Sequence, residues 1–315
     1  MSDPTHRLRR LAPEPAPAVA LPIGSAAFGG AVVRLLRPRQ WIKNGLVVAA
    51  AGAAGALGRD GVPYRVTLAF FAFCLLASGI YAINDVRDAP EDRLHPRKRR
   101  RPVAAGEIEP ASALRLGAVL LAAGIGLCWL VTPLLALVGA AYVALTLSYT
   151  LVWRHVVVLD LLVISGGFVL RAIAGGVAAP VALSRWFVLV VSATAVFIAA
   201  AKRYSEMQRS TRDSGPRRRV LELYSPKGLG VIMGASVTLA VFAYSVWAFN
   251  LPSVGGFPWR PLTILPFAAC LLRYSARVRV GAAESPDELL LSDRLLLLAT
   301  GTWLLLFALG VDAAS

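Results

Sequence analysis

Long apolar runs recur along almost the whole chain, and they limit the folds that it can adopt. Nine stretches have the length and apolar character of helices that cross a bilayer, at residues 41–58, 65–84, 111–131, 133–153, 156–178, 184–202, 228–249, 261–277 and 294–311. Of the 315 residues, 57% are hydrophobic, and this composition argues against a soluble single domain. The sequence therefore predicts an all-α integral membrane protein with nine transmembrane helices.

Lys and Arg are distributed unevenly over the loops between these runs. Loops on one side receive Arg34, Arg37, Arg39 and Lys43, the 87–101 cluster, Arg154, the run from Lys202 to Lys227, and Arg273, Arg277 and Arg279. Loops on the other side receive only Arg59, Arg65, Arg185 and Arg260. The positive-inside rule puts the basic side and the amino terminus in the cytoplasm, and an odd number of spans puts the carboxyl terminus outside. The net charge of +15 is thus assigned to topology and anionic lipid, and nucleic-acid binding is not expected.

The rest of the composition suggests one membrane domain without a disulfide framework. Residues 1–33 are rich in Pro, Gly and Ala and are predicted to form a flexible cytoplasmic tail, whereas residues 34–315 are predicted to form a transmembrane catalytic domain. Cys74, Cys128 and Cys270 all fall within apolar runs and lack metal-ligand spacing, so they are predicted to be small buried hydrophobes.

The stretch NDVRDAPEDRLHPRKRRRPVAAG at residues 84–106 crowds acids and bases together between two apolar runs. Asn84, Asp88 and Asp92 follow the spacing i, i+4, i+8, which puts them along one face of a continuous helix, with Asp85 beside them. Carboxylates this close repel one another unless a cation intervenes, and Mg²⁺ uses one or two carboxylates together with the phosphate oxygens of a substrate. We therefore predict a Mg²⁺ site at these four residues and a diphosphate-bearing substrate.

Two further features belong to the same stretch. Pro90 disfavours a regular helix between Asp88 and Asp92, which favours a turn or a new short helix at Asp92. Six bases follow the acids, namely Arg93, Arg97, Lys98, Arg99, Arg100 and Arg101. For Arg97 and Arg100 we favour an ordinary loop on anionic lipid. The others suit a polyanion held by both metal and cation, because Arg grips phosphate oxygens with a fork and Lys acts as a point charge.

Three charged positions resist a lipid-facing interpretation. Asp160 lies about one turn into the fifth predicted span, Arg171 lies deeper in the same span, and Glu206 follows the sixth span closely. An unpaired charge in the bilayer is costly, so Asp160 and Arg171 should face the bundle interior. Pairing that only fixes helix packing is one explanation, and a polar cavity that opens to the cytoplasm is the other; their depth favours the cavity.

The Asn84-x3-Asp88-x3-Asp92 pattern at the end of a second span resembles the UbiA-type superfamily of intramembrane prenyltransferases, and the resemblance runs from Arg37 to the ninth span. In that superfamily this motif holds Mg²⁺ and the diphosphate of a prenyl donor, and a second DxxxD motif follows the sixth span. Here that place reads KRYSE, with Lys202 and Glu206 at the two acidic positions. An ammonium in place of a carboxylate removes a metal ligand and suits an additional phosphate.

Four stretches together resemble one branch of the superfamily, the decaprenyl-phosphate phosphoribosyltransferases. They are RPRQWIKN at 37–44, the 84–106 stretch, DLLVISGGFVLRAIAGG at 160–176 and AKRYSE at 201–206. The resemblance implies transfer of 5-phosphoribosyl from 5-phosphoribosyl 1-diphosphate to polyprenyl (decaprenyl) phosphate, with release of diphosphate, for cell-wall arabinan precursors. It also implies a UbiA-like bundle in the cell membrane with its active site facing the cytoplasm.

The same resemblance suggests roles for individual residues. Catalytic roles fall to Asp85, Asp88 and Asp160, the last of which would hold the ribose hydroxyls or complete the metal site. Substrate contacts are expected from Gln40, Lys43, Asn84, Arg93, Lys98, Arg99, Arg101, Arg171, Lys202, Arg203, Tyr204 and Glu206. Lys43 lies at the cytoplasmic lip of the first span with Gln40 and Asn44, where it would meet the acceptor phosphate or act as an interfacial lysine.

Two other functions stay open at this point. A prenyl diphosphate-dependent transferase would alkylate an aromatic or haem-like acceptor. A transporter or lipid-scrambling protein would use the charged loops only to bind head groups, but it would be expected to place essential charges near the bilayer midplane. Residues 207–226 are interpreted equally well as a lid, a strap on the lipid surface or a linker, and a homo-oligomer is not excluded.

Overall fold

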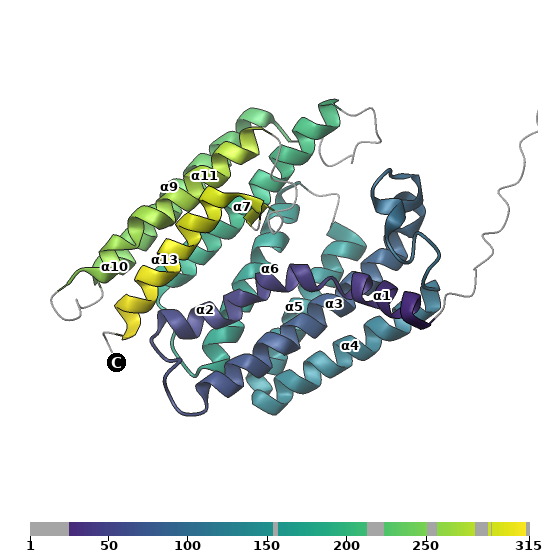
Figure 1. Cartoon of the computed structure of the whole chain (residues 1–315), viewed down its shortest axis with the longest axis horizontal. Coiled ribbons are helices and arrows are strands. Elements are labelled where there is room, and N and C mark those ends of the chain that lie inside the picture. Colours follow the sequence, from purple (N-terminus) through teal and green to yellow (C-terminus); the bar gives the residue numbers. More distant parts are fainter. Residues whose placement is uncertain are drawn as a thin grey trace, which may run out of the picture.

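The computed structural model describes residues 25–153, 157–212, 224–250, 257–280, 289–290 and 292–312, and its regular structure in these ranges is helical (Figure 1). The main helices are α1 (Ser25–Leu36), α2 (Gly45–Ala53), α3 (Val62–Leu94), α4 (Pro110–Val131), α5 (Pro133–Ser148), α6 (Val157–Ala178), α7 (Arg185–Arg212), α9 (Pro226–Asn250), α11 (Ile264–Arg279) and α13 (Arg294–Asp312). Short elements are the 3-10 helices η3 (Pro38–Asn44) and η4 (Lys98–Arg100), the π-helix η5 (Tyr149–Trp153) and α10 (Trp259–Leu262).

Within the described ranges, six helices are long and apolar enough to cross a membrane: α3, α4, α5 with most of η5, α6, α7 and α9. This result confirms a multi-pass, all-α chain. The other three predicted spans, 41–58, 261–277 and 294–311, coincide with α2, α11 and α13. Helix α2 has only 9 residues and α11 has 16, whereas a span needs about 20. Nine crossings therefore stay a prediction.

Proline marks the start of several of these helices. Pro63 lies in the first turn of α3, and α4, α5 and α9 each begin on a proline. The missing N–H of proline costs nothing at a helix start, where no partner exists for it. Thr132, between α4 and α5, accepts a hydrogen bond from the Leu134 N–H at 3.0 Å and so caps α5.

Two apolar clusters organise the bundle, and α6 contributes to both. The first cluster contains residues of α2, α3, α4, α5 and α6 and surrounds Phe73 and Tyr142. The second contains residues of α6, α7, α9 and α11 and surrounds Phe197 and Tyr274. Figure 1 shows α3, α4 and α5 on one side, α9, α11 and α13 on the other, and α6 and α7 between them. Helix α6 approaches α2 so closely that a Cβ on Gly175 would lie 2.0 Å from the Val47 carbonyl oxygen.

The polar end of α3 differs from the sequence prediction. The helix continues through Pro90 to Leu94, so the break favoured between Asp88 and Asp92 is wrong. Proline removes the hydrogen bond to one carbonyl, that of Val86, within the last turns of the helix. Asp92 therefore shares one helix with the other acids.

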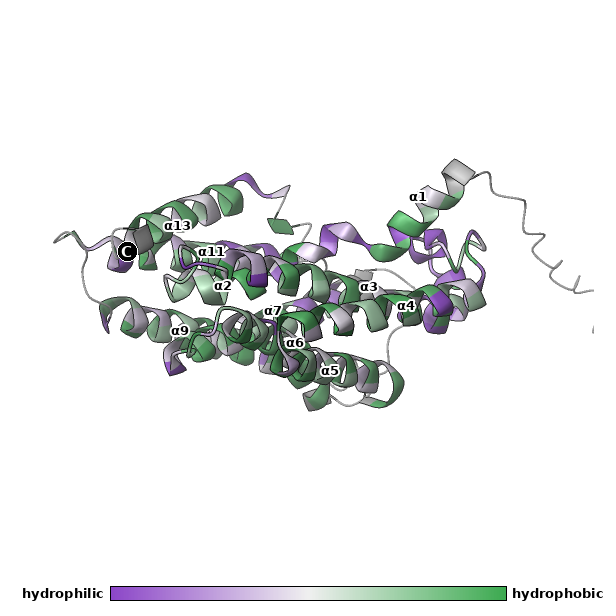
Figure 2. Cartoon of the chain, turned by 90° about the horizontal axis from the view of Figure 1, so that it is seen from below, coloured by the Kyte–Doolittle hydropathy of each residue, from purple (hydrophilic) through white to green (hydrophobic). Residues whose placement is uncertain are grey.

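Helix α1 lies across this polar end. It begins at Ser25, so the predicted tail boundary at residue 33 falls inside a helix; residues 1–24 lie outside the described part. Leu35 of α1 is buried in a small cluster with Val103 and Ile108. Figure 2 shows hydrophilic residues gathered at the end of the molecule near α1 and the start of α4, whereas the middle of the bundle is mostly hydrophobic.

Candidate functional site

The last turns of α3 present three carboxylates on one face of the helix. Asp85, Asp88 and Asp92 are separated by three and four residues, which puts them within one helical stripe. Asp85 is 1% exposed, Asp92 is also buried, and the Asp88 side chain is 25% exposed. Like charges at this spacing repel one another, so the array requires compensating cations.

The guanidinium of Arg101 contacts all three carboxylates. Its Nη1 lies 2.6 Å from Oδ2 of Asp92, 3.5 Å from Oδ1 of Asp85 and 4.0 Å from Oδ2 of Asp88. Arg101 lies seven residues beyond the end of α3, so the chain must fold back along the helix to bring it there. The structure therefore places one predicted phosphate-binding arginine on the predicted metal ligands.

Arg37 provides a second cation, which sequence reasoning counted only as a topological charge. Its Nη2 forms an ion pair with Oδ1 of Asp85, and its guanidinium lies 5.0 Å from the centre of the Tyr81 ring. The backbone of Arg37 has φ 54° and ψ 58°, a left-handed conformation that is uncommon for a residue with a side chain. Its position in RPRQWIKN was the available signal, because that stretch carries part of the family resemblance.

Further contacts fasten the η3 segment to α3. The Ser78 hydroxyl donates to the Leu36 carbonyl at 2.9 Å and accepts from Trp41 Nε1 at 3.1 Å. On the same turn, Lys43 Nζ donates to Gln40 Oε1 at 3.4 Å. The predicted substrate contacts Gln40 and Lys43 are thus adjacent and are carried by an element that is tied to the acid-bearing helix.

The segment after α3 is held by hydrogen bonds as well as by buried side chains. Nδ1 of His95 accepts from the backbone N–H groups of Arg97 at 3.2 Å and Lys98 at 3.3 Å. Arg93 Nε donates to the Ala104 carbonyl at 3.4 Å. Arg93 is therefore used within the loop, whereas Arg99 is exposed and Lys98 is half-buried.

Two oxygens at the array fit a hard cation. Oδ1 of Asn84 and Oδ2 of Asp85 are buried and have no hydrogen-bond partner among the described residues. No set of three His, Cys, Asp or Glu side chains converges in metal-binding geometry in the described ranges. Mg²⁺ is usually held by one or two carboxylates with substrate phosphates and water, so this partial set of oxygen donors fits a cation that arrives with a phosphate ligand.

Arg171 is buried and is bonded to three elements. It donates to Asn44 Oδ1 at 2.7 Å, to the Gly167 carbonyl at 2.8 Å and to the Tyr142 hydroxyl at 2.8 Å. Arg171 thus joins η3, α5 and α6, which satisfies much of its hydrogen-bonding capacity within the protein. A substrate contact by Arg171 stays a prediction. Asp160 lies in α6, but its side chain is outside the described part.

The stretch on α7 connects to the acids through the π-helix η5. Arg203 is buried, pairs with Glu206 and donates to the Tyr149 hydroxyl of η5 at 3.0 Å. From α3, Arg87 donates to the Leu151 carbonyl of the same element at 3.3 Å. Lys202, Tyr204 and Glu206 are half-buried. Tyr149 and Arg87 were not predicted as site residues. Through η5 they link the 202–206 stretch of α7 to the acid-bearing end of α3.

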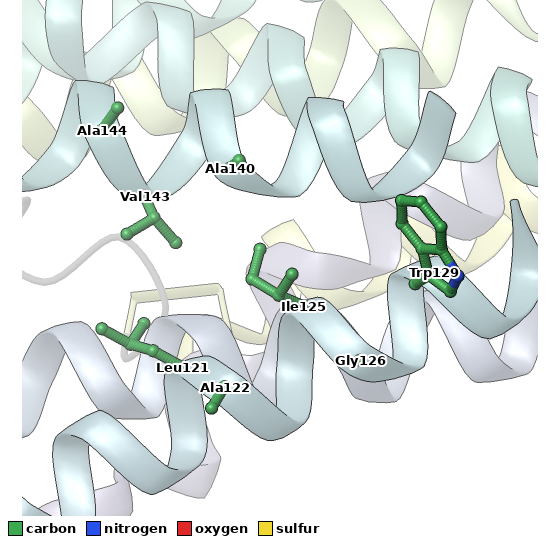
Figure 3. Close-up of a pocket in the computed structure, with 8 residues that line it drawn as sticks. All are labelled: Leu121, Ala122, Ile125, Gly126, Trp129, Ala140, Val143 and Ala144. Atoms are coloured by element: carbon green, nitrogen blue, oxygen red, sulfur yellow. The ribbon is translucent and has the colours of Figure 1, made fainter. Parts of the chain in front are cut away.

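A groove on the outside of α4 and α5 is a different feature. It has a volume of about 700 Å³ and is lined by Leu121, Ala122, Ile125, Gly126, Trp129, Ala140, Val143 and Ala144 (Figure 3). None of these residues is charged or belongs to the predicted site. The predicted cytoplasm-facing polar cavity is not this groove, and it stays a prediction.

Comparison with known proteins identifies the family. Residues 45–300 match the UbiA prenyltransferase family. The chain belongs to this family. It is 41% identical over 286 residues to the decaprenyl-phosphate phosphoribosyltransferase of Corynebacterium glutamicum, covering 89% of this chain and 86% of that protein. The enzyme of the same name from Mycolicibacterium smegmatis is 39% identical over 314 residues, covering 96% of both chains. Both the superfamily resemblance and the branch resemblance are confirmed.

Solved structures of UbiA family members share the fold at low sequence identity. A UbiA homolog from Archaeoglobus fulgidus bound to Cd²⁺ superposes with a TM-score of 0.66 at 15% identity, covering 90% of this chain and 98% of that chain. The same homolog bound to GPP and Mg²⁺ gives a TM-score of 0.62 at 14% identity, with 90% and 99% covered. The UbiA family therefore carries this helical architecture over nearly the whole chain.

Proposed function

We propose that this protein transfers the 5-phosphoribosyl group from 5-phosphoribosyl 1-diphosphate to decaprenyl phosphate or a similar polyprenyl phosphate, and that it releases diphosphate. The observation that carries this proposal is the 39–41% identity to enzymes of that name over nearly the full chain. The product would be a lipid-linked phosphoribose, a precursor for cell-wall arabinan.

The array on α3 suits departure of the diphosphate. When that bond breaks, positive charge develops at the anomeric carbon of the ribose, as in glycoside chemistry. Asn84, Asp85, Asp88 and Asp92 would hold Mg²⁺, which supplies charge neutralisation and a template for the leaving diphosphate. Arg101 lies among these acids and can grip phosphate oxygens. A Mg²⁺-bound A. fulgidus homolog supports this metal.

The acceptor requires little activation. A polyprenyl phosphate is already an anionic nucleophile, so positioning accounts for much of the catalysis. Lys43 and Gln40, fastened to α3 through η3, would bind the acceptor phosphate. Asp160 would hold the ribose hydroxyls or complete the metal site.

The second phosphate of the donor calls for a cation of its own. Lys202 and Glu206 replace the second acidic motif of the superfamily, and Lys202 would bind the 5-phosphate. Arg203 and Tyr204 would support this end of the site, since Arg203 is fixed by Glu206 and Tyr149. This assignment supports a phosphoribosyl donor over a prenyl diphosphate.

Cellular placement follows from the charge distribution. We place the protein in the cell membrane with its amino terminus, the acid array and the 202–206 stretch on the cytoplasmic side, where a soluble phosphorylated sugar is supplied.

The reaction can be tested with purified protein, labelled 5-phosphoribosyl 1-diphosphate, Mg²⁺ and polyprenyl phosphate. The label should move into the lipid phase, and it should stay in water when polyprenyl phosphate is omitted. A blank result, together with turnover of a prenyl diphosphate and an aromatic acceptor, would replace the proposal by the prenyltransferase alternative.

A further inference from the structure

We infer that Arg101 is a built-in counter-ion that competes with the divalent cation, so that the cation binds strongly only together with a diphosphate. The inference deepens the proposed function, in which the cation and diphosphate share this array, and it assigns Arg101 a second role besides phosphate binding. It starts from the observation that the guanidinium already bridges three carboxylates.

The contacts of Arg101 and the needs of a metal ion overlap. A cation bound at the array would draw on oxygens of Asp85, Asp88 and Asp92, and Nη1 of Arg101 lies within 4.0 Å of all three side chains. Two cations that share one set of carboxylates repel each other. A divalent ion that arrives alone must therefore either displace the guanidinium or bind beside it, and both outcomes weaken its binding.

The loop allows the Arg101 side chain to move without unfolding. Pro102, Val103 and Ala104 are buried directly after it, and Val103 packs in the cluster with Leu35 of α1. The Arg101 side chain is nevertheless 26% exposed. Its backbone is thus anchored while the guanidinium borders solvent, so a side-chain rotation would turn it from the carboxylates to a new anion.

A diphosphate removes this competition between Arg101 and the metal ion, because it is an anion that Arg101 can bind instead of the carboxylates. Its oxygens would complete the coordination of the metal ion and would also accept hydrogen bonds from the Arg101 guanidinium. The guanidinium then exchanges carboxylate partners for phosphate partners rather than losing them. Arg37 keeps its own pair with Asp85 throughout. Metal and diphosphate then each raise the affinity of the protein for the other by the same factor.

Equilibrium dialysis tests this coupling in full-length protein purified in detergent, with Mn²⁺ as the probe and inorganic diphosphate present or absent. In Arg101→Gln, binding of Mn²⁺ alone should tighten by about tenfold because a competing charge is gone. The enhancement by diphosphate should shrink. Arg100→Gln removes the same charge from the exposed neighbour in η4, and it should change Mn²⁺ binding less than about twofold.

Arg101→Lys separates charge from fork geometry and is informative even if Arg101→Gln does not fold. It should keep the weak binding of Mn²⁺ alone but lose part of the diphosphate enhancement, since an ammonium cannot grip two oxygens at once. Equal or weaker Mn²⁺ binding in Arg101→Gln, or an unchanged enhancement in Arg101→Lys, would overturn the inference. So would a wild-type protein that retains no Mn²⁺ under either condition.

These measurements are independent of the transfer assay. Wild-type protein that labels the lipid while Arg101→Gln binds Mn²⁺ as the wild type does would keep the proposed function and reject the counter-ion role. If the wild type does not label the lipid but Arg101→Gln binds Mn²⁺ more tightly than the wild type does, the proposed reaction is rejected and the counter-ion role is kept.

Discussion

The three aspartates of α3 share one helix face but differ in burial and in how closely they are paired with arginine. Asp85 is buried and paired with Arg37, and Asp92 is buried at 2.6 Å from Arg101. Asp88 is a quarter exposed and its nearest Arg101 nitrogen lies at 4.0 Å. A neutral residue at Asp88 leaves the closer ion pairs of Asp85 with Arg37 and of Asp92 with Arg101 in place, so Asp88 is a better position than either for separating activity from stability.

We expect Asp88→Asn to abolish phosphoribosyl transfer while the protein stays folded, because the change removes a ligand charge with little change in volume. Transfer by the wild type should likewise stop in chelator and return with Mg²⁺. Activity can be followed as label in the lipid phase, and folding as the melting temperature in detergent. Full turnover by Asp88→Asn, or turnover that chelator leaves unchanged, would exclude the metal site.

Lys202 is the residue that decides between the two donors. Lys202→Met should weaken binding of 5-phosphoribosyl 1-diphosphate by about ten- to a hundredfold, as expected for loss of one charge-assisted contact. The Michaelis constant for the polyprenyl phosphate should change little. An analogue that lacks the 5-phosphate serves as the control substrate, since the variant should treat it as the wild type does. An equal penalty on both donors would mean that Lys202 does not bind the 5-phosphate.

At the scale of elements, apolar length and i, i+4 spacing were enough to predict α3 and its acidic face. They could not predict that α3 continues through Pro90, because local pattern says that proline removes one helical hydrogen bond but not whether the surrounding structure tolerates the loss. Nor could spacing show that Arg37 and Arg101 meet at Asp85, since both arrive through chain reversals outside α3. Tertiary path, rather than local pattern, determines these contacts.

Close approach of α2 and α6 leads to a prediction about packing. Gly175→Ala places a methyl group against the Val47 carbonyl and should destabilise the protein by about 1–3 kcal/mol. Gly234→Ala in α9 is the matched control, because nothing lies within 4 Å of its added Cβ, and it should be neutral or slightly stabilising. Thermal melting in one detergent compares the two. Equal effects would show that α2 is not packed on α6 as described.

Asp293 links α11 to α13 and makes a pH-dependent contribution to the stability of the fold. It accepts from Arg273 at 2.9 Å, lies 3.3 Å from Arg277 and caps α13 through the Leu296 N–H at 3.1 Å. The hydrogen bond from Arg273, above all, holds the pKa of Asp293 below its ordinary value. A lowered pKa stabilises the fold above the unfolded-state pKa of about 3.9, and that stabilisation is lost as pH falls through the folded-state value.

The melting temperature of Asp293→Asn should therefore lie below that of the wild type at pH 7, and the two should converge as the pH is lowered below about 4. Measuring both proteins across this range in an acid-stable detergent cancels the titration of the other carboxylates. A gap that does not change with pH would show that the carboxylate charge is not what links the two helices.

For the whole molecule, the number of crossings determines where the chain ends. Six crossings would return the carboxyl terminus to the side of the amino terminus, whereas nine crossings put the two on opposite sides. Helices α2, α11 and α13, which are not among the six, make the difference. Helix α2 lies against α6, and α11 lies against α13.

We expect nine crossings, with the amino terminus cytoplasmic and the carboxyl terminus outside, because base-rich and base-poor loops alternate under that count. Reporter fusions at both termini, and in the loop after α9, check this arrangement. Termini on one side of the membrane would mean that one or all of α2, α11 and α13 fail to cross.

The length of α3 has a consequence for where lipid and water meet. Its 33 residues extend for about 50 Å, whereas the hydrocarbon core is about 30 Å thick. With Val62 at the far surface, Asp85 stands about 35 Å along the helix, at head-group depth. A polyprenyl phosphate carries its own phosphate at that height, so it would react in place, with its tail still dissolved among the lipids. Polyprenyl chains that partition equally well should then be used at similar rates whatever their length, and a rate that keeps rising with length would require a dedicated tail channel instead.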